Sequence, residues 1–156
     1  MGAETKLREF LALIDPSKMP GQRRPGLPFP TAFLFGKGRF WTPAPLPPDI
    51  PFGTRKMCFQ NAFQLMISNP RRYRYAEGYA LEKDFGVPLE HAWCVTESGT
   101  VMDPTWRTPE RTAYFGVALD ATVTCRVLAA TETYGVLDYA TWRVAGPILH
   151  ESVMSV

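Results

Sequence analysis

Three residues of this chain, Cys58, His91 and Asp103, carry side chains that together could attack a carbonyl group. A cysteine attacks as its thiolate, and the ordinary cysteine pKa of about 8.5 leaves little thiolate at neutral pH unless neighbouring groups favour it. A histidine can take the thiol proton, and a carboxylate can orient the imidazole and stabilise the imidazolium. These residue types predict a catalytic triad of nucleophile, base and orienting acid.

The nucleophile is expected in the first turn of a helix over residues 57–68. Apolar residues recur there at helical spacing, and Asn69-Pro70 ends the pattern. The first turn of a helix has unpaired N–H groups and the positive end of the helix dipole. Cys58 would therefore be favoured as a thiolate, and its backbone N–H could donate to an oxyanion.

The base and the orienting acid are expected on two neighbouring strands. A strand over residues 91–96 begins with His91, and residues 97–99 have the composition of a hairpin connection. The returning strand over residues 100–103 would then place Asp103 beside His91 as its cross-strand neighbour.

Helical and strand patterns along the whole chain indicate the α+β class, with the nucleophile helix packed on an antiparallel β-sheet. The other expected elements are a helix over residues 3–14, strands over 73–81 and 114–118, a turn over 83–88, a helix over 120–130 capped by Asp120, and a short apolar segment over 142–144.

A single domain is expected over residues 1–156, since this length and the 46% hydrophobic content are sufficient for one core. The segment over 16–53 holds ten of the 15 prolines and many aromatic residues, which indicates an ordered but irregular wrap. The expected parts are an N-terminal helix at 1–15, this wrap at 16–53, a catalytic core at 54–106 and a C-terminal extension at 107–156.

The charge pattern gives no reason to expect binding to nucleic acid or to a membrane. The formal net charge of +2 is spread along the chain without a long run of one sign. Arginines alternate with tyrosines over residues 71–75, a pattern that could bind single-stranded nucleic acid, but a strand with a basic solvent face is the preferred interpretation.

A soluble, cytoplasmic protein with reduced thiols is expected. The N-terminus lacks the apolar stretch of a secretion signal, and no apolar run of about 18 residues occurs. The three cysteines are odd in number and widely spaced, which argues against a disulfide framework. Cys94 and Cys125 are interpreted as buried apolar filler.

Four short motifs, taken in order, resemble the core of the transglutaminase-like superfamily of papain-like thiol enzymes. That core has a helix-borne cysteine, a Gly-Tyr strand, a His-Ala-Trp strand and an Asp-Pro-Thr strand, and the resemblance covers roughly residues 52–106. The motifs here are Cys58-Phe-Gln-Asn-Ala, Tyr75-Ala-Glu-Gly-Tyr79, His91-Ala-Trp-Cys-Val95 and Gly99-Thr-Val-Met-Asp103-Pro-Thr105.

The resemblance implies a papain-like, transglutaminase-like fold without metal or cofactor, and the same three roles for Cys58, His91 and Asp103. Related enzymes use a glutamine or tryptophan side chain upstream of the nucleophile as a second oxyanion donor. No glutamine lies just before the cysteine, which leaves Trp41 as the candidate, although an aromatic residue of the wrap is the preferred interpretation of Trp41. Other residues that could face the site are Asn61, Gln64 and Trp93.

Each of these residues also has a structural interpretation. A helical cysteine is often a small apolar filler, a strand histidine is often a satisfied structural group, and Asp103-Pro104 could cap a turn. A metal site formed by His91, Cys94, Cys58 and Asp103 is a further alternative. It is disfavoured because residues 91 and 94 of a regular strand point to opposite faces.

The leading functional hypothesis is a thiol enzyme that acts on an amide bond of a peptide or protein through a thioester acyl-enzyme, with hydrolysis favoured over transfer to an amine. A non-catalytic module that uses the aromatic segment from Phe29 to Trp41 as a recognition surface is the alternative from another class. A protease that trims a leader from a small peptide is a third possibility and differs only in substrate.

Overall fold

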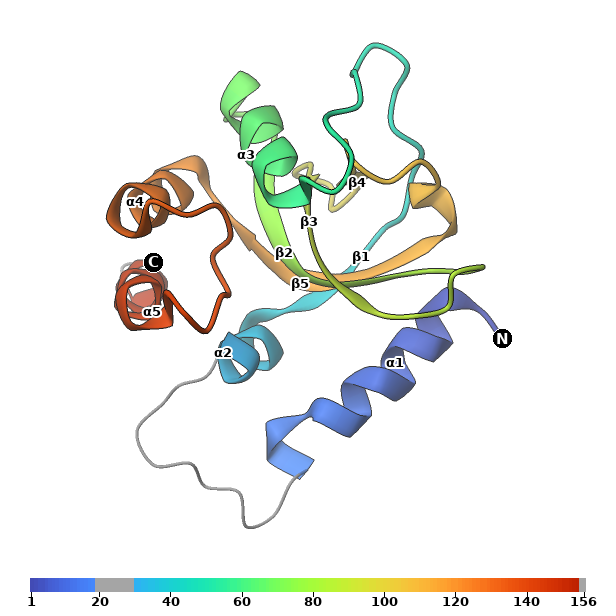
Figure 1. The fold of residues 1–156 in the computed structure, drawn as a ribbon, viewed down its shortest axis with the longest axis horizontal. Coiled ribbons are helices and arrows are strands. Elements are labelled where there is room, and N and C mark those ends of the chain that lie inside the picture. Colours follow the sequence, from blue (N-terminus) through green and yellow to red (C-terminus); the bar gives the residue numbers. More distant parts are fainter. Residues whose placement is uncertain (19–29, 155–156) are drawn as a thin grey trace.

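The chain has the expected α+β architecture in a computed structural model that describes residues 1–18 and 30–154, with side chains described as far as residue 152 (Figure 1). The five helices of the described part are α1 (Ala3–Ile14), α2 (Pro30–Lys37), α3 (Cys58–Ser68), α4 (Ala121–Thr131) and α5 (Trp142–Met154), with short 3-10 turns at Pro16–Lys18 and Pro109–Arg111. The strands are β1 (Arg39–Trp41), β2 (Arg74–Glu82), β3 (Leu89–Val95), β4 (Val101–Met102) and β5 (Thr112–Leu119).

The five strands form one antiparallel sheet in the order β1-β5-β2-β3-β4. The sheet is curled, because residues after β1 cross to the opposite edge and join the chain beside β4. Thr42 donates its N–H to the Gly99 carbonyl at 3.0 Å, and its own carbonyl accepts from the N–H of Val101 at 2.9 Å. These bonds connect the two edges of the sheet.

The inner face of the curled sheet holds a small apolar cluster. Trp93 and Tyr114 are fully buried there, with ring centroids 4.9 Å apart. The other buried members are Ala76, Ala80, Val95 and Val101, and Trp41 packs against them. Large aromatic rings in this small interior leave the polar groups beside them shielded from water.

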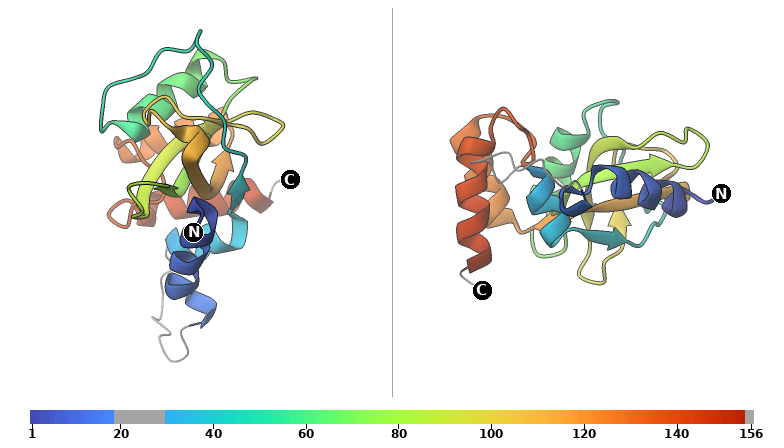
Figure 2. Two further views of the ribbon diagram at one scale, coloured as in Figure 1. Left: turned by 90° about the vertical axis from the view of Figure 1, so that its right-hand side faces the viewer. Right: turned by 90° about the horizontal axis from the view of Figure 1, so that it is seen from below.

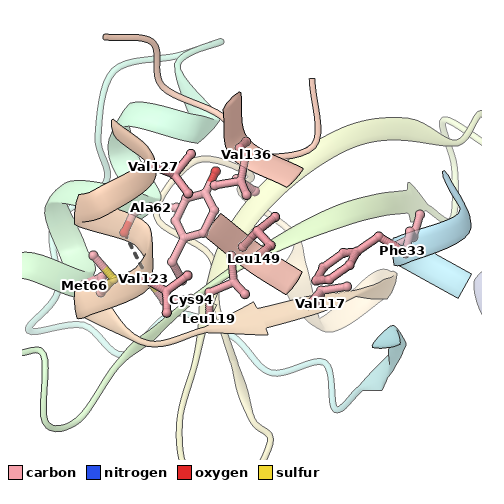
Figure 3. Packing of buried hydrophobic residues seen from close by; sticks show 14 of the residues in the cluster. Phe33, Ala62, Met66, Cys94, Val117, Leu119, Val123, Val127, Val136 and Leu149 are labelled. Atoms are coloured by element: carbon pink, nitrogen blue, oxygen red, sulfur yellow. Dashed lines mark hydrogen bonds between the residues drawn. The ribbon is translucent and has the colours of Figure 1, made fainter. Parts of the chain in front are cut away.

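The outer face of the sheet carries the larger core, which α3, α4 and α5 cover (Figure 3). Figure 2 shows α4 and α5 side by side at one end of the molecule. The N-cap residue of α4, Asp120, accepts the N–H of Val123 at 2.9 Å, as expected for a helix start. Helix α1, which matches the helix predicted over residues 3–14, packs on β2 and β5 through Leu7 and Leu11.

Most predicted elements are confirmed, but the segment over 16–53 is more regular than expected. It contains α2 and β1 in addition to irregular chain, and its residues 19–29 lie outside the described part. Pro30 opens α2, a position where a proline needs no N–H partner, and Phe33 and Leu34 bury the helix against the core.

The short apolar segment over 142–144 is the first turn of a 13-residue helix, α5, which the sequence pattern did not predict. Pro147 lies inside α5, and a proline in a helix interior costs about 3 kcal/mol. Burial of Trp142, Ala145 and Leu149 on one side offsets this cost. His150 is part of this helix, and its ring lies 5.7 Å from that of Phe33.

Candidate active site

Cys58, His91 and Asp103 lie together, although they come from a helix, a strand and a loop. The Nε2 atom of His91 is 2.8 Å from Oδ2 of Asp103, and the two side chains are only 1% and 0% exposed. Cys58 lies close enough to His91 to contribute to the raised pKa of its imidazole. Since Nε2 faces the carboxylate, Nδ1 is the ring nitrogen that serves the thiol.

Asp103 is held by four hydrogen bonds. Its Oδ2 accepts from His91 and from the Tyr114 hydroxyl at 2.7 Å, and its Oδ1 accepts from the N–H groups of Thr105 at 2.9 Å and Trp106 at 3.1 Å. Burial by itself would raise the pKa of Asp103. The charge of His91 and these hydrogen bonds outweigh burial and hold that pKa below its usual value.

His91 is sandwiched between its acid partner and aromatic rings. The ring of Trp106 stacks on it with centroids 4.0 Å apart, and the ring of Trp93 lies 6.1 Å away. Burial opposes its protonation, but the charge and hydrogen bond of Asp103, with a smaller effect from Cys58, raise the pKa of His91 to about 9. The imidazolium is therefore the stable form at neutral pH, and this is the form that accompanies a thiolate.

Cys58 is the first residue of α3, and its side chain is half-buried. The preceding residue, Met57, provides no side-chain cap. The N–H groups of Cys58, Phe59 and Gln60 have no acceptor among the residues the structure describes. The sulfur thus lies at a helix end with free donors, a setting that favours negative charge.

The position of Asp103 differs in one detail from the predicted hairpin. The β3–β4 ladder ends at the pair Cys94 and Met102, so Asp103 follows the strand and does not belong to it. Continuing this register would place Asp103 opposite Trp93, and its carboxylate reaches His91 diagonally. The predicted contact is present, but the aspartate is not the directly opposed cross-strand neighbour.

The structure gives other partners to Trp41, the candidate oxyanion donor, and to Asn61, a residue expected to face the site or line the helix. The indole N–H of Trp41 donates to the Gly116 carbonyl at 2.9 Å. The amide Nδ2 of Asn61 donates to the Thr54 carbonyl at 2.7 Å and to Oγ1 of Thr105 at 2.9 Å. Asn61 therefore connects the segment before α3, at Thr54, to the segment after Asp103, at Thr105.

Trp93 and Gln64 do not reach an accessible surface of the site. Trp93, which could have faced the site, is completely buried and offers no surface to a substrate, and its Nε1 has no hydrogen-bond partner in the described structure. Gln64 is exposed further along α3. Trp93 instead forms the apolar floor beneath the imidazole.

Sequence reasoning missed two residues of the site, Tyr114 and Trp106. Tyr114 reaches Asp103 from β5, which comes after the predicted core, and no local pattern relates it to the triad. Trp106 directly follows the Asp-Pro-Thr motif, and its position three residues after Asp103 is the only signal that could have suggested a role.

Comparison of the chain with protein-family models, curated proteins and solved structures finds no match. The assignment of the site therefore depends on its own geometry.

The described residues include no group of three or more His, Cys, Asp or Glu side chains arranged to hold a metal ion. Cys94, which the alternative metal site would need, donates its thiol to the Ala62 carbonyl at 3.1 Å within the outer core. Burial, and next the charge of Asp103, raise the pKa of the Cys94 thiol.

Over residues 1–18 and 30–154, no helix combines the length and apolar character needed to span a bilayer.

The basic and aromatic pattern over residues 71–75 is divided between surface and core. The three arginines of the pattern are exposed, whereas Tyr73 and Tyr75 are 5% and 1% exposed. Aromatic rings that could stack on bases are consequently absent from the surface of this segment.

Proposed function

We propose that this chain is a thiol enzyme of the transglutaminase-like superfamily, with a papain-like core, that acts on amide bonds of peptides or proteins. The observation that supports the proposal is the order of the three groups: the Cys58 thiol lies near the imidazole of His91, and this imidazole forms a hydrogen bond with the carboxylate of Asp103. The same order and roles define nucleophilic catalysis by cysteine in general.

The proposed reaction proceeds through a thioester. The Cys58 sulfur, after its proton has passed to His91, attacks the amide carbon, and the carbonyl oxygen becomes an oxyanion. The C–N bond then breaks, and the amine leaves with the proton that His91 returns. Water, deprotonated by His91, attacks the thioester and releases the acid and the thiol. We favour water over a second amine as the acceptor.

The backbone N–H of Cys58 is the proposed donor to the oxyanion. It lies on the helix residue that carries the nucleophile and has no acceptor in the described structure. A preorganised donor of this kind typically contributes about 3 kcal/mol to stabilisation of the transition state.

The alternative of a non-catalytic binding module finds less support. Its recognition surface would be the aromatic segment ending at Trp41, of which Phe29 lies outside the described residues. Phe33 is 6% exposed in the outer core, and Trp41 packs in the inner cluster. The rings of Phe40 and Phe115 pack 5.1 Å apart. These rings pack within the fold, and Phe40 and Trp41 are only partly exposed, which leaves a small surface for a partner.

Alkylation by iodoacetamide at graded pH tests the proposal. We expect Cys58 to react at pH 6 at least about tenfold faster than Cys125, a half-buried thiol of the same protein. Peptide mapping by mass spectrometry assigns each labelled thiol. His91→Ala should abolish the fast reaction, whereas His150→Ala, at the second histidine, should leave it unchanged.

An inert Cys58 in the folded protein would contradict the proposal, as would equal labelling rates in the parent and His91→Ala. Because loss of a buried imidazole could unfold the chain, circular dichroism of each variant must accompany the labelling. Should His91→Ala be unfolded, Asp103→Asn provides the same comparison with nearly unchanged side-chain volume.

A further inference from the structure

A cleft of about 710 Å³ opens beside the triad. Its lining includes a residue two positions from each triad member: Lys56 before Cys58, Leu89 before His91 and Thr105 after Asp103. Trp106, whose ring stacks on that of His91, also lines it. Chain bound in this cleft would therefore lie next to the reacting groups.

The cleft carries positive charge without a matching negative charge. Arg55, Lys56 and Arg107 line it, and none of the three forms an ion pair with a carboxylate of the described residues. The acidic group of the cleft is Glu82, whose carboxylate accepts the N–H groups of two residues of the following turn and lies 4.0 Å from Arg111. Its charge is thus already compensated.

Lys56, which lines the cleft, has an uncommon backbone conformation. Its φ of 64° lies in the left-handed region, which non-glycine residues seldom adopt. Conformations of this kind cost about 1 kcal/mol or more and occur preferentially at functional sites. Arg107 is also fixed, because its guanidinium lies 4.1 Å from the ring centroid of Phe52.

Large apolar side chains line the same cleft or lie next in sequence to residues that line it. Phe85 and Leu89 line it and are 62% and 41% exposed, and Val87, between them in sequence, is 48% exposed. Met57, next to the nucleophile, is 42% exposed. Exposed apolar groups gathered around a cleft indicate a surface that a partner covers.

We propose that this cleft binds the substrate chain beside the scissile amide and selects a segment in which an acidic side chain neighbours an apolar one. Arg55, Lys56 and Arg107 pair with the acidic group, and Phe85, Leu89 and Trp106 contact the apolar group. The inference rests on the proposed thiol-enzyme function and adds to it the class of substrate. Charge complementarity identifies the acidic segment, and the apolar rim favours a peptide over a nucleic acid.

Two matched reagents test the charge preference: chloroacetyl-Phe-Asp-amide and chloroacetyl-Phe-Asn-amide, which differ in one charge. We expect the aspartate reagent to alkylate Cys58 about fivefold faster at low salt, and less so at high salt. In the variant Arg55→Gln/Lys56→Gln/Arg107→Gln the two rates should become equal. A control with three exposed arginines replaced, Arg71→Gln/Arg72→Gln/Arg74→Gln, should keep the difference.

Iodoacetamide, uncharged and small, separates failure of this inference from failure of the proposed function. If iodoacetamide labels Cys58 rapidly but the two peptide reagents react at equal rates in the parent protein, the charge preference is wrong and the thiol enzyme stands. An inert Cys58 overturns both. Slowing of the peptide reagents by a single-stranded oligonucleotide at least as strongly as by an Asp-Phe peptide would also overturn the inference, because it assigns the cleft to nucleic acid.

Discussion

Asp103 determines the protonation state of His91, the proposed catalytic base. Four donors surround its carboxylate, and two of them, the imidazole of His91 and the Tyr114 hydroxyl, share Oδ2. A buried carboxylate is costly unless it is paired and hydrogen-bonded. The donors therefore keep Asp103 ionised, and the ionised carboxylate keeps His91 protonated.

Replacing Asp103 by asparagine should lower the pKa of His91 from about 9 towards or below the ordinary value of 6.5. The charge and the strong hydrogen bond of the carboxylate disappear, and burial, which disfavours the imidazolium, then dominates. Titration of the His91 ring protons by NMR measures the change, with His150 as the internal reference. A His91 pKa that stays near 9 would contradict this account.

Tyr114→Phe should destabilise the protein by about 2 kcal/mol, because it removes a hydrogen bond to a buried carboxylate without replacing it. Urea unfolding gives the free-energy difference. Tyr134→Phe is the matched control, since Tyr134 is 41% exposed and should tolerate the same change with little effect. If the two variants are equally stable, the hydrogen bond from the Tyr114 hydroxyl to Asp103 does not stabilise the fold.

At the scale of elements, a second buried carboxylate connects β2 to the segment between α4 and α5. Glu77 accepts the N–H of Val136 at 2.8 Å, that of Leu137 at 2.6 Å and the Tyr75 hydroxyl at 2.5 Å. Phe59, directly after the nucleophile, lines one cavity together with Glu77 and Leu137. Glu77 thus fixes a segment far along the chain against β2.

Glu77→Gln should destabilise the fold by about 2 kcal/mol, because one amide group must then face an N–H or hydroxyl donor that needs an acceptor. Hydrogen exchange should show the loss of protection first at the Val136 and Leu137 amides. Glu90→Gln, at an exposed residue of β3, serves as the control. Unchanged protection of both amides would show that Glu77 does not hold this segment.

The contact between β2 and β5 depends on a pair of facing glycines, Gly78 and Gly116. A Cβ on Gly116 would lie 2.5 Å from the Glu77 carbonyl and 2.7 Å from Cη2 of Trp93. Gly116→Ala should therefore cost about 2 kcal/mol or more in unfolding free energy. Gly36→Ala, where an added Cβ meets no atom within 4 Å, should not destabilise the protein, as thermal unfolding of both variants will show.

At the scale of the whole molecule, the curled sheet encloses a charged pair in an aromatic interior, and this links folding to pH. The pKa of His91 is raised from 6.5 to about 9, so the folded chain binds this proton more tightly than the unfolded chain. The pKa of Asp103 is lowered in the folded chain. The stability that its ionised form contributes is therefore present above the usual aspartate pKa and is lost as the pH falls through the lowered pKa.

The free energy of unfolding should consequently fall as pH rises from 6.5 to about 9. The His91 contribution is complete below pH 6.5, and a difference of this size corresponds to about 3 kcal/mol for the coupled pair. Urea unfolding at several pH values measures the slope. The slope should be absent in His91→Gln, and a parent protein equally stable at pH 6.5 and 9 would contradict the assigned pKa.

The sequence by itself determined the elements that carry the chemistry. Local patterns predicted the helix that begins at Cys58, the strand of His91 and the return to Asp103, because helical spacing, strand alternation and hairpin residues act over a few neighbours. They failed at α2, within the proline-rich segment, and at α5, where burial against distant residues outweighs the local signal of Pro147.

Only the tertiary structure decided which side chains complete the site. Tyr114 reaches Asp103 from a strand placed by the sheet order β1-β5-β2-β3-β4, and the donors of Trp41 and Asn61 are taken by carbonyl and hydroxyl groups of other segments. Hydrogen-bond partners and burial depend on contacts between residues far apart in the chain. The types and spacing of residues limit what a side chain can do, and the packed fold determines which of these options it uses.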